Sequence, residues 1–304
     1  MTEKQQGMGQ HAATELSRED HRVTLNGVDL FYRTVGEGPV LLMIPPGWGV
    51  ASDYLQRSFL SLAENYRLVF MDTRGSGRSG RPADSSRMGT MDMAEDIEAM
   101  RVHLGLEKIS LLGHSNSGAI TLAYAERYPD RVVKLVMVSS QVLGLSGMEA
   151  TQKIIQSRER DPRFEDAVRA VVPFFQGQLN AGESDETLER FIGKILPLYL
   201  HSPEKTLARV AEMLMGPIAS YAFRNQFAAD RAAKVDQTEF LGDVMAQTLI
   251  VVGREDFICP VPISERLTQG IRGSRLVILE ESGHFGWLEE PETFFAELLP
   301  FLAS

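Results

Sequence analysis

The chain has 304 residues, enough for one large α/β domain or two smaller ones with a sizeable buried core. Its hydrophobic fraction of 43% and charged fraction of 24% are those of an ordinary globular protein. With 31 basic and 41 acidic residues the net charge is -10 and no basic stripe stands out, which argues against nucleic acid as a partner.

The cysteine content and the N-terminus bear on compartment. Cys259 is the single cysteine, so no intrachain disulfide can form and nothing calls for an oxidising compartment. Residues 1–20 are polar throughout and lack the apolar core of a signal peptide, and no run reaches the roughly 18 apolar residues of a membrane span. We therefore expect a mobile tail over 1–20, a cytoplasmic location and no membrane partner.

Apolar runs of strand length alternate with helical patterns in the first half of the chain. Residues 21–38 are typical of a hairpin with its turn at Asn26 and Gly27. Continuous apolar strands that alternate with helices predict a buried parallel sheet. The expected strands are 39–44, 66–72, 108–113 and 132–138, and the expected helices are 52–65, 90–105 and 116–128.

This alternation stops after residue 143. Residues 144–236 show helical patterns only, and alternation resumes with strands at 248–253 and 275–280. The sequence thus predicts a core of 21–143 and 237–304, interrupted by a helical cap of 144–236. Most apolar residues of the cap should be core, and a minority should line a pocket. They include Phe174, Phe175, Tyr199, Met213, Met215, Tyr221 and Phe223.

Ser115 is the candidate nucleophile. It lies in "LLGHSNSGAI", at the corner between the strand ending at Leu112 and the helix from Asn116. A Gly-x-Ser-x-small pattern is unspecific alone, but at a strand-to-helix corner it is typical of a nucleophile elbow. Gly113 and Ser117 are the small residues that let the backbone turn. Ser117 lies further into the helix and should point into packing.

A serine nucleophile needs a base and an acid. His284 is the only histidine that follows a late strand, and the base of this architecture comes late in the chain, after the acid. Glu255 and Asp256 follow the preceding strand, and Asp256 is expected to face His284 and hold its tautomer. The loop after the strand at 132–138, the other place for the acid, contains no carboxylate.

Five motifs in order then resemble a known family. The chain is similar to α/β-hydrolases of the cofactor-free Ser-Asp-His type over residues 21–304. The resemblance implies an α/β-hydrolase fold, with a mostly parallel sheet, flanking helices and an inserted helical cap. It also implies a small-molecule substrate, no cofactor and no metal, and it leaves a homo-oligomer open. The motifs are "MDTRGSGRS", which resembles proline-iminopeptidase-like members in particular, "GHSNSG", "AYAERYPDRVVKLVMVSS", "VVGREDFICP" and "SGHFGWLEEPETFFAELLPFL".

One loop departs from the family pattern. Members usually carry His-Gly where this chain has "LLMIPPGWG". The loop must still supply a backbone N–H to an oxyanion hole, together with the N–H of Asn116. Pro45 and Pro46 have no N–H, so Gly47 is the first possible donor and Trp48 the next. Trp48 should also form an aromatic wall of the substrate pocket.

A second glycine motif is a decoy. "GSGRSG" at 75–80 satisfies a dinucleotide fingerprint after a strand, but Pro82 prevents a helix from opening at its last glycine. Without that helix N-terminus the loop does not cradle a pyrophosphate. Asp72 and Arg74 are expected to brace the loop instead.

The sequence favours one reaction and leaves others open. Ser115 should attack an acyl carbonyl while His284 carries the proton, and water then resolves the acyl-enzyme. No amine anchor is evident in "PPGWG" or at Asn116, so a carboxylic ester or lactone with an apolar body is favoured over a proline iminopeptidase-like aminopeptidase. A non-catalytic ligand receptor and a lyase on the same fold remain the alternatives from other classes.

Overall fold

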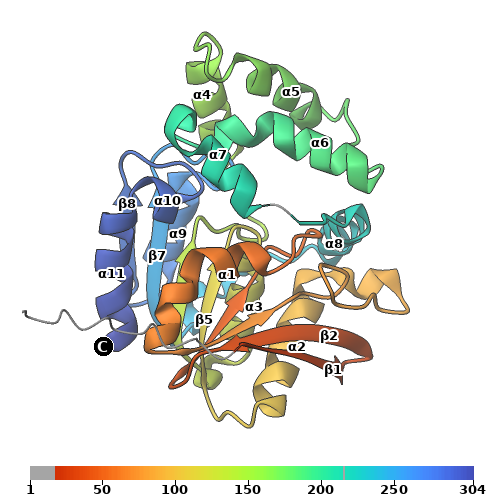
Figure 1. Cartoon of the computed structure of the whole chain (residues 1–304), viewed down its shortest axis with the longest axis vertical. Helices are drawn as coiled ribbons and strands as arrows, with labels where there is room; N and C mark the ends of the chain where they lie inside the picture. Colours follow the sequence, from red (N-terminus) through yellow and green to blue (C-terminus); the bar gives the residue numbers. More distant parts are fainter. Residues whose placement is uncertain (1–17, 215) are drawn as a thin grey trace, which may run out of the picture.

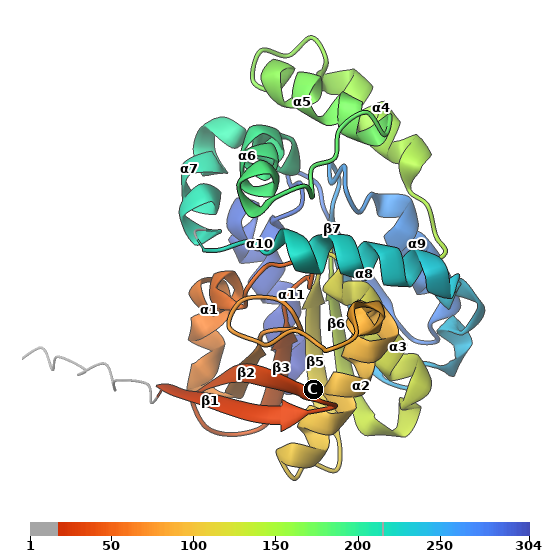
Figure 2. The ribbon, with the colours of Figure 1, turned by 90° about the vertical axis from the view of Figure 1, so that its right-hand side faces the viewer.

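A mostly parallel sheet runs through the molecule (Figures 1 and 2). The computed structural model describes residues 18–304 apart from 215. The strands follow the order β1-β2-β4-β3-β5-β6-β7-β8; β1 and β2 are antiparallel to their neighbours and the others are parallel. They are β1 (Arg18–Leu25), β2 (Val28–Val35), β3 (Val40–Ile44), β4 (Arg67–Met71), β5 (Ile109–His114), β6 (Val132–Val138), β7 (Gln247–Gly253) and β8 (Arg275–Leu279).

The predicted hairpin is present, but the predicted tail is three residues too long. Asn26 and Gly27 join β1 to β2 with φ of 49° and 75°, as a type I′ turn requires. Residues 18–20, predicted to belong to the tail, form the start of β1 and pair with β2. An edge strand tolerates such charged residues because its side chains reach water, and Asp20 pairs with Arg33 across the hairpin. Residues 1–17 of the predicted tail lie outside the described residues.

Helices cover both faces of the parallel strands. The apolar side chains of α1, α10 and α11 pack on one face, and those of α2, α3 and α9 on the other. Strands covered on both sides have no polar face, which explains their continuous apolar runs. No helix in the described part of the chain is long and apolar enough to cross a membrane. These helices are α1 (Asp53–Phe59), α2 (Thr90–His103), α3 (Ser117–Arg127), α9 (Val261–Gly270), α10 (Gly286–Glu289) and α11 (Pro291–Ala303).

The segment 144–236 contains helices that lie beyond the carboxyl ends of the parallel strands (Figure 1). Its first part has its own apolar cluster, built from α4, α5 and α6. Its last helix, α8, packs on the core instead, where Ala222 is fully buried. The division into core and cap stays a prediction. The helices are α4 (Met148–Arg158), α5 (Glu165–Phe175), α6 (Asp185–Ile195), α7 (Pro203–Met213) and α8 (Ser220–Ala233).

A buried ion pair anchors the loop after β4. Arg74 donates from Nε and Nη2 to the two carboxylate oxygens of Asp96 in α2, at 2.7 and 2.6 Å, and from Nη1 to the carbonyl oxygen of Arg87. Both paired residues are at most 2% exposed. The pair holds the loop against α2, because a buried guanidinium satisfied by three acceptors cannot be displaced without exposing charge to an apolar interior.

We expect Asp96→Ala to lower the free energy of unfolding by about 3–5 kcal/mol, since it leaves the Arg74 charge buried without a partner. Urea unfolding followed by circular dichroism measures this. Glu149→Ala removes an exposed ion pair with Lys153 on α4 and serves as control, with an expected change of at most about 0.5 kcal/mol. Equal effects of the two substitutions would contradict the bracing role of the buried pair.

Glu126, near the end of α3, gives a pH-dependent prediction. Burial raises its pKa from 4.5 to about 8, helped by Asp243 and opposed by a hydrogen bond from Gln237, and its Oε1 has no partner among the described residues. The folded state therefore holds the proton more tightly than the unfolded state, and stability is lost as pH rises from about 4.5 to about 8. Glu126→Gln should gain stability relative to wild type between pH 5 and pH 9, measured by thermal unfolding. A constant difference across that range would contradict the shift.

Candidate active site

Ser115 follows β5 directly and has φ of +62°, a left-handed value that non-glycine residues rarely adopt. This strained turn between β5 and α3 is the geometry of a nucleophile elbow. Gly113 must be small, because a Cβ there would lie 2.7 Å from Thr121 Oγ1. Ser117 points into the interior, where its Oγ accepts from His114 N and lies 2.6 Å from the Ile44 carbonyl oxygen. Of the two serines of the elbow, Ser115 is thus the one that lines the cavity described below.

The predicted base and acid are joined. His284 Nδ1 donates to Asp256 Oδ2 at 2.8 Å, and both residues are almost completely buried. Burial alone would raise the pKa of Asp256, but the His284 ring, the Cys259 amide and Ser139 outweigh it and hold the pKa below its ordinary value. The ionised carboxylate keeps the proton on Nδ1, so Nε2 is free to accept one. In the described part of the chain no hydrogen bond joins Ser115 Oγ to His284.

His114, the residue before the predicted nucleophile, supports the His284 backbone. Its Nε2 lies 3.1 Å from the His284 carbonyl oxygen, which can only accept, so Nε2 carries the proton. Its Nδ1 then accepts from the Tyr54 hydroxyl at 3.0 Å. Burial, together with the nearby His284, lowers the pKa of His114 well below its ordinary value, which keeps the ring neutral. The pattern Gly-x-Ser carried no signal for this contact.

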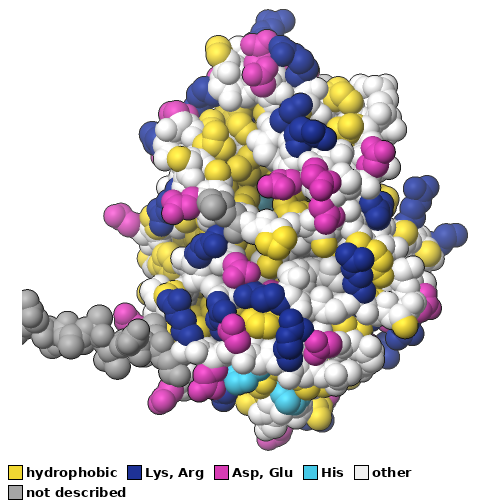
Figure 3. Space-filling model, turned by 45° about the vertical axis from the view of Figure 1, so that its right-hand side comes forward, with side chains coloured by type: hydrophobic (Ala, Val, Ile, Leu, Met, Phe, Trp, Pro, Cys, Tyr) yellow, Lys and Arg dark blue, Asp and Glu magenta, His cyan; other side chains and the backbone are white. Residues whose placement is uncertain are grey.

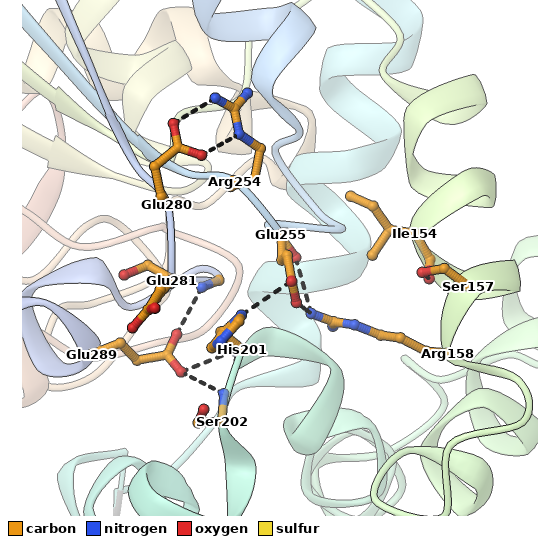
Figure 4. A network of polar contacts seen from close by, with 12 residues as sticks. Ile154, Ser157, Arg158, His201, Ser202, Arg254, Glu255, Glu280, Glu281 and Glu289 are labelled. Atoms are coloured by element: carbon orange, nitrogen blue, oxygen red, sulfur yellow. Dashed lines mark hydrogen bonds and ion pairs between the residues drawn. The ribbon is translucent and has the colours of Figure 1, made fainter.

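Contacts with segment 144–236 hold the loops that carry His284 and Asp256 (Figure 4). His284 N donates to the Tyr199 carbonyl oxygen at 2.7 Å. Glu255, next to Asp256, pairs with Arg158 at 2.7 Å, and its carboxylate lies 3.0 Å from His201 Nδ1. Glu289 in turn accepts from three backbone N–H groups, one of them in the His284 loop. These are the N–H groups of His201, Ser202 and Gly283.

The two donors predicted for the loop after β3 differ in whether their N–H is already engaged. Trp48 N donates to Gln226 Oε1 at 2.9 Å and is therefore engaged. Within residues 18–304 apart from 215, neither Gly47 N nor Asn116 N donates a hydrogen bond. Gly47 lies between Pro46 and Trp48, which both line the cavity. Of the two donors predicted for this loop, the geometry favours Gly47.

The glycine-rich segment 75–80 braces this loop. No helix opens at Gly80; the next helical turn, η2, spans Ser85–Met88. Ser76 Oγ accepts from Gly49 N and donates to the Gly47 carbonyl oxygen, each at 3.2 Å. Asp72 accepts from Ser52 N at 2.7 Å. The segment thus serves as a support for the loop after β3.

Comparison with known proteins decides the family. The model of the alpha/beta hydrolase fold matches residues 40–291. The chain belongs to the α/β-hydrolase family. It is 31% identical to a proline iminopeptidase of Saccharolobus solfataricus, over 91% of this chain and 89% of that protein. It is 25% identical to a 2-hydroxy-6-oxo-6-phenylhexa-2,4-dienoate hydrolase of Comamonas testosteroni, over 90% and 91%.

Solved structures agree in fold. The enol-lactonase from Burkholderia xenovorans LB400 superposes with a TM-score of 0.71 at 19% identity, over 93% of this chain and all of that one. The chain is accordingly a hydrolase of the α/β-hydrolase family. Its relatives differ in substrate, so the substrate class depends on the cavity.

The cavity of this α/β-hydrolase has a volume of about 650 Å³ and is lined by Ser115, Asn116 and His284 together with a large apolar surface. Figure 3 shows hydrophobic side chains gathered around a hollow in the upper half of the molecule. Of the cap residues named from the sequence, Tyr221 packs against the core and Met215 lies outside the described residues. The others line the cavity: Phe174, Phe175, Tyr199, Met213 and Phe223.

Few charged side chains line the cavity of the hydrolase. Among its described lining residues, the carboxylates are Asp53 and Asp230 and the cation is Arg231. Asp53 pairs with Arg78 at 2.8 Å. Asp230 accepts from the N–H and hydroxyl of Thr90 at the start of α2, and Arg231 is exposed. Asp53 is thus neutralised by a guanidinium, whereas Asp230 bonds neutral donors and burial raises its pKa, which disfavours the ionised form that a substrate cation would need.

One cluster of potential metal ligands lies in the described chain. Asp256, Cys259 and His284 have ligand atoms within 4.8 Å of one another. Burial raises the pKa of the Cys259 thiol well above its ordinary value, and Asp256 adds to the rise. Because a metal binds the thiolate and not the thiol, this environment disfavours a metal centre in the hydrolase.

We expect Asp256→Asn to lower kcat by about 10³–10⁴-fold, because the amide lets His284 take the tautomer in which Nε2 carries the proton. Circular dichroism and KM should stay close to those of wild type. Steady-state kinetics on an aryl ester measure the change. Glu280→Gln, which removes an exposed ion pair with Arg254, is the control and should keep kcat within a few-fold. Equal losses in both variants would contradict the assignment of the acid.

Proposed function

We propose that the chain hydrolyses a carboxylic ester or lactone with an apolar body, through an acyl-enzyme on Ser115. The observation that carries this proposal is the 2.8 Å bond between Asp256 and His284 in the wall of a cavity that Ser115 also lines. A nucleophile, a base with a fixed tautomer and two free N–H groups are the parts that acyl transfer needs.

Each part has a defined role. His284 Nε2 takes the proton from Ser115 Oγ as Oγ bonds to the acyl carbon, and the carbonyl oxygen becomes an oxyanion held by Gly47 N and Asn116 N. Collapse of this intermediate breaks the bond to the alcohol oxygen, which receives the proton from His284. Water then repeats the sequence and releases the acid. In a lactone the alcohol and the acid are the two ends of one product.

The charge of the cavity wall favours an ester over a peptide with a free amino terminus. Such an amine needs an ionised carboxylate, yet Asp53 is paired with Arg78, and burial raises the pKa of Asp230, whose donors on Thr90 are neutral. The similarity to a proline iminopeptidase keeps aminopeptidase activity as the second candidate. Most of the other side chains that line the cavity are aromatic or aliphatic, which suits a substrate with a neutral apolar body.

Segment 144–236 supplies much of this wall, so we assign it the role of a cap over the site. Residues of α5, α6 and α8 face the cavity, including Phe174, Phe191 and Phe223. A cap of this kind excludes water from the acyl-enzyme and selects the substrate by shape. A ligand receptor or a lyase, the alternatives from other classes, would form no acyl-enzyme. An experiment that detects the reactive serine therefore distinguishes them from the proposed hydrolase.

A side-by-side panel of aryl esters, lactones and a prolyl arylamide tests the substrate class. We expect turnover of an ester or lactone to exceed that of the prolyl arylamide, because Asp53 is paired with Arg78 and burial disfavours ionisation of Asp230 in the described wall. Turnover of prolyl arylamide above every ester and lactone would replace the proposed function with the aminopeptidase.

The same panel with Ser115→Ala tests the nucleophile. Loss of Ser115 should reduce kcat by about 10⁵–10⁶-fold. Ser117→Ala, two positions along the elbow, is the matched control and should retain the reaction. A fluorophosphonate probe should label wild type and the control but not Ser115→Ala. Labelling that survives loss of Ser115 would move the nucleophile elsewhere, and absence of labelling in wild type would favour a receptor or lyase.

A further inference from the structure

Gln226 is a polar side chain of α8 that is fully buried. It is not among the described residues that line the cavity, and the mechanism above does not use it. Its amide bonds two separate parts of the predicted oxyanion hole. Oε1 accepts from Trp48 N at 2.9 Å, and Nε2 donates to Asn116 Oδ1 at 2.6 Å.

The direction of this hydrogen-bond chain is fixed by a backbone group. Trp48 N–H can only donate, so the atom of Gln226 that faces it is the oxygen, and the nitrogen faces Asn116. Asn116 Oδ1 is then the acceptor, and its Nδ2 donates to Gln141 Oε1 at 3.2 Å. The side-chain amides of Gln226, Asn116 and Gln141 therefore each have one orientation.

The loop that Gln226 holds is strained. Gly47, Trp48 and Gly49 have successive φ values of 73°, 28° and 85°, and a tryptophan at positive φ is costly. Such a backbone persists only where its surroundings hold it. A Cβ at Gly47 would lie 2.5 Å from Gln226 Oε1, so the amide also occupies the space beside the predicted oxyanion donor.

We propose that Gln226 is a positioning residue that sets the orientation of the Gly47–Trp48 loop relative to Asn116 and thereby builds the oxyanion hole from the cap. The proposal rests on the proposed function. It deepens it by making the oxyanion hole depend on a side chain of segment 144–236. Because Gln226 engages Trp48 N, it also selects Gly47 as the donor of that loop.

Gln226→Met keeps the length of the side chain and removes its hydrogen bonds to Trp48 and Asn116, together with the longer one to Thr90 at 3.5 Å. Misplaced donors weaken the transition state more than the ground state, so kcat on the best ester should fall about 10–100-fold with KM within about twofold. Asn225→Met is the matched control: an amide-to-methionine change on the same helix, at a residue whose side chain bonds, among the described residues, only the Tyr221 carbonyl oxygen. It should leave kcat within about twofold.

Gln226→Glu provides a readout that a merely structural role would not move. A protonated carboxyl group can accept from Trp48 N and donate to Asn116, as the amide does. The carboxylate can only accept, and it places a negative charge beside the forming oxyanion. kcat of this variant should therefore fall as pH rises through the titration of the new carboxyl group, a limb that wild type lacks. A wild-type-shaped profile would overturn the positioning role.

Hydrogen exchange measures the loop without any substrate. The amides of Trp48 and Gly49, which donate to Gln226 and Ser76, should exchange at least about tenfold faster in Gln226→Met than in Asn225→Met. Unchanged exchange, or a kcat loss that only matches the unfolded fraction, overturns the inference. Failure of wild type to turn over any ester in a Ser115-dependent way would instead overturn the proposed function, and the exchange result would still decide the role of Gln226.

Discussion

The site depends on one buried hydrogen bond, between Asp256 Oδ2 and His284 Nδ1. It joins two loops that leave β7 and β8 at the same edge of the sheet, where the carboxyl ends of parallel strands meet. An ionised carboxylate in an apolar interior is costly unless donors surround it, and here two backbone N–H groups share Oδ1. The loop geometry that surrounds the Asp256 carboxylate with donors also fixes the position of His284, the predicted base.

The hydrogen bond between Asp256 and His284 requires His284 to stay in place, and contacts of its ring and backbone with His114 and Tyr199 hold it there. The His114 ring lies 4.6 Å from that of His284, centroid to centroid, and bonds its carbonyl oxygen. Tyr199 bonds the N–H of the same residue through its own carbonyl oxygen. His284 is thus held on both sides of its backbone, once by the elbow and once by segment 144–236. Its ring can exchange protons without its position changing.

Much of this arrangement could be predicted from the sequence, because strong local signals carried it. The apolar strands and the strand-to-helix corner at Ser115 are patterns of neighbouring residues, and the order of acid and base follows from the fold. The start of β1 could not be predicted, since residues 18–20 are charged and an exposed edge strand carries no alternation. Gln226 left no local signal either. Its role depends on a contact with Trp48, 178 positions away, within a stretch of ordinary helical pattern.

The contacts of α8 add a second role to the cap that we propose for segment 144–236. A cap that only covered the cavity would affect substrate access and shape. Here α8 also bonds the backbone of the loop after β3 through Gln226, and it satisfies the start of α2 through Asp230. Both residues lie on the same face of one helix, four positions apart, and they are linked through Thr90. Movement of α8 away from the core would therefore break the support of the loop and the N-terminus of α2 together. The predicted donors of the oxyanion hole and the packing of α8 on the core thus depend on the same hydrogen bonds, which ties the proposed site to the docking of segment 144–236.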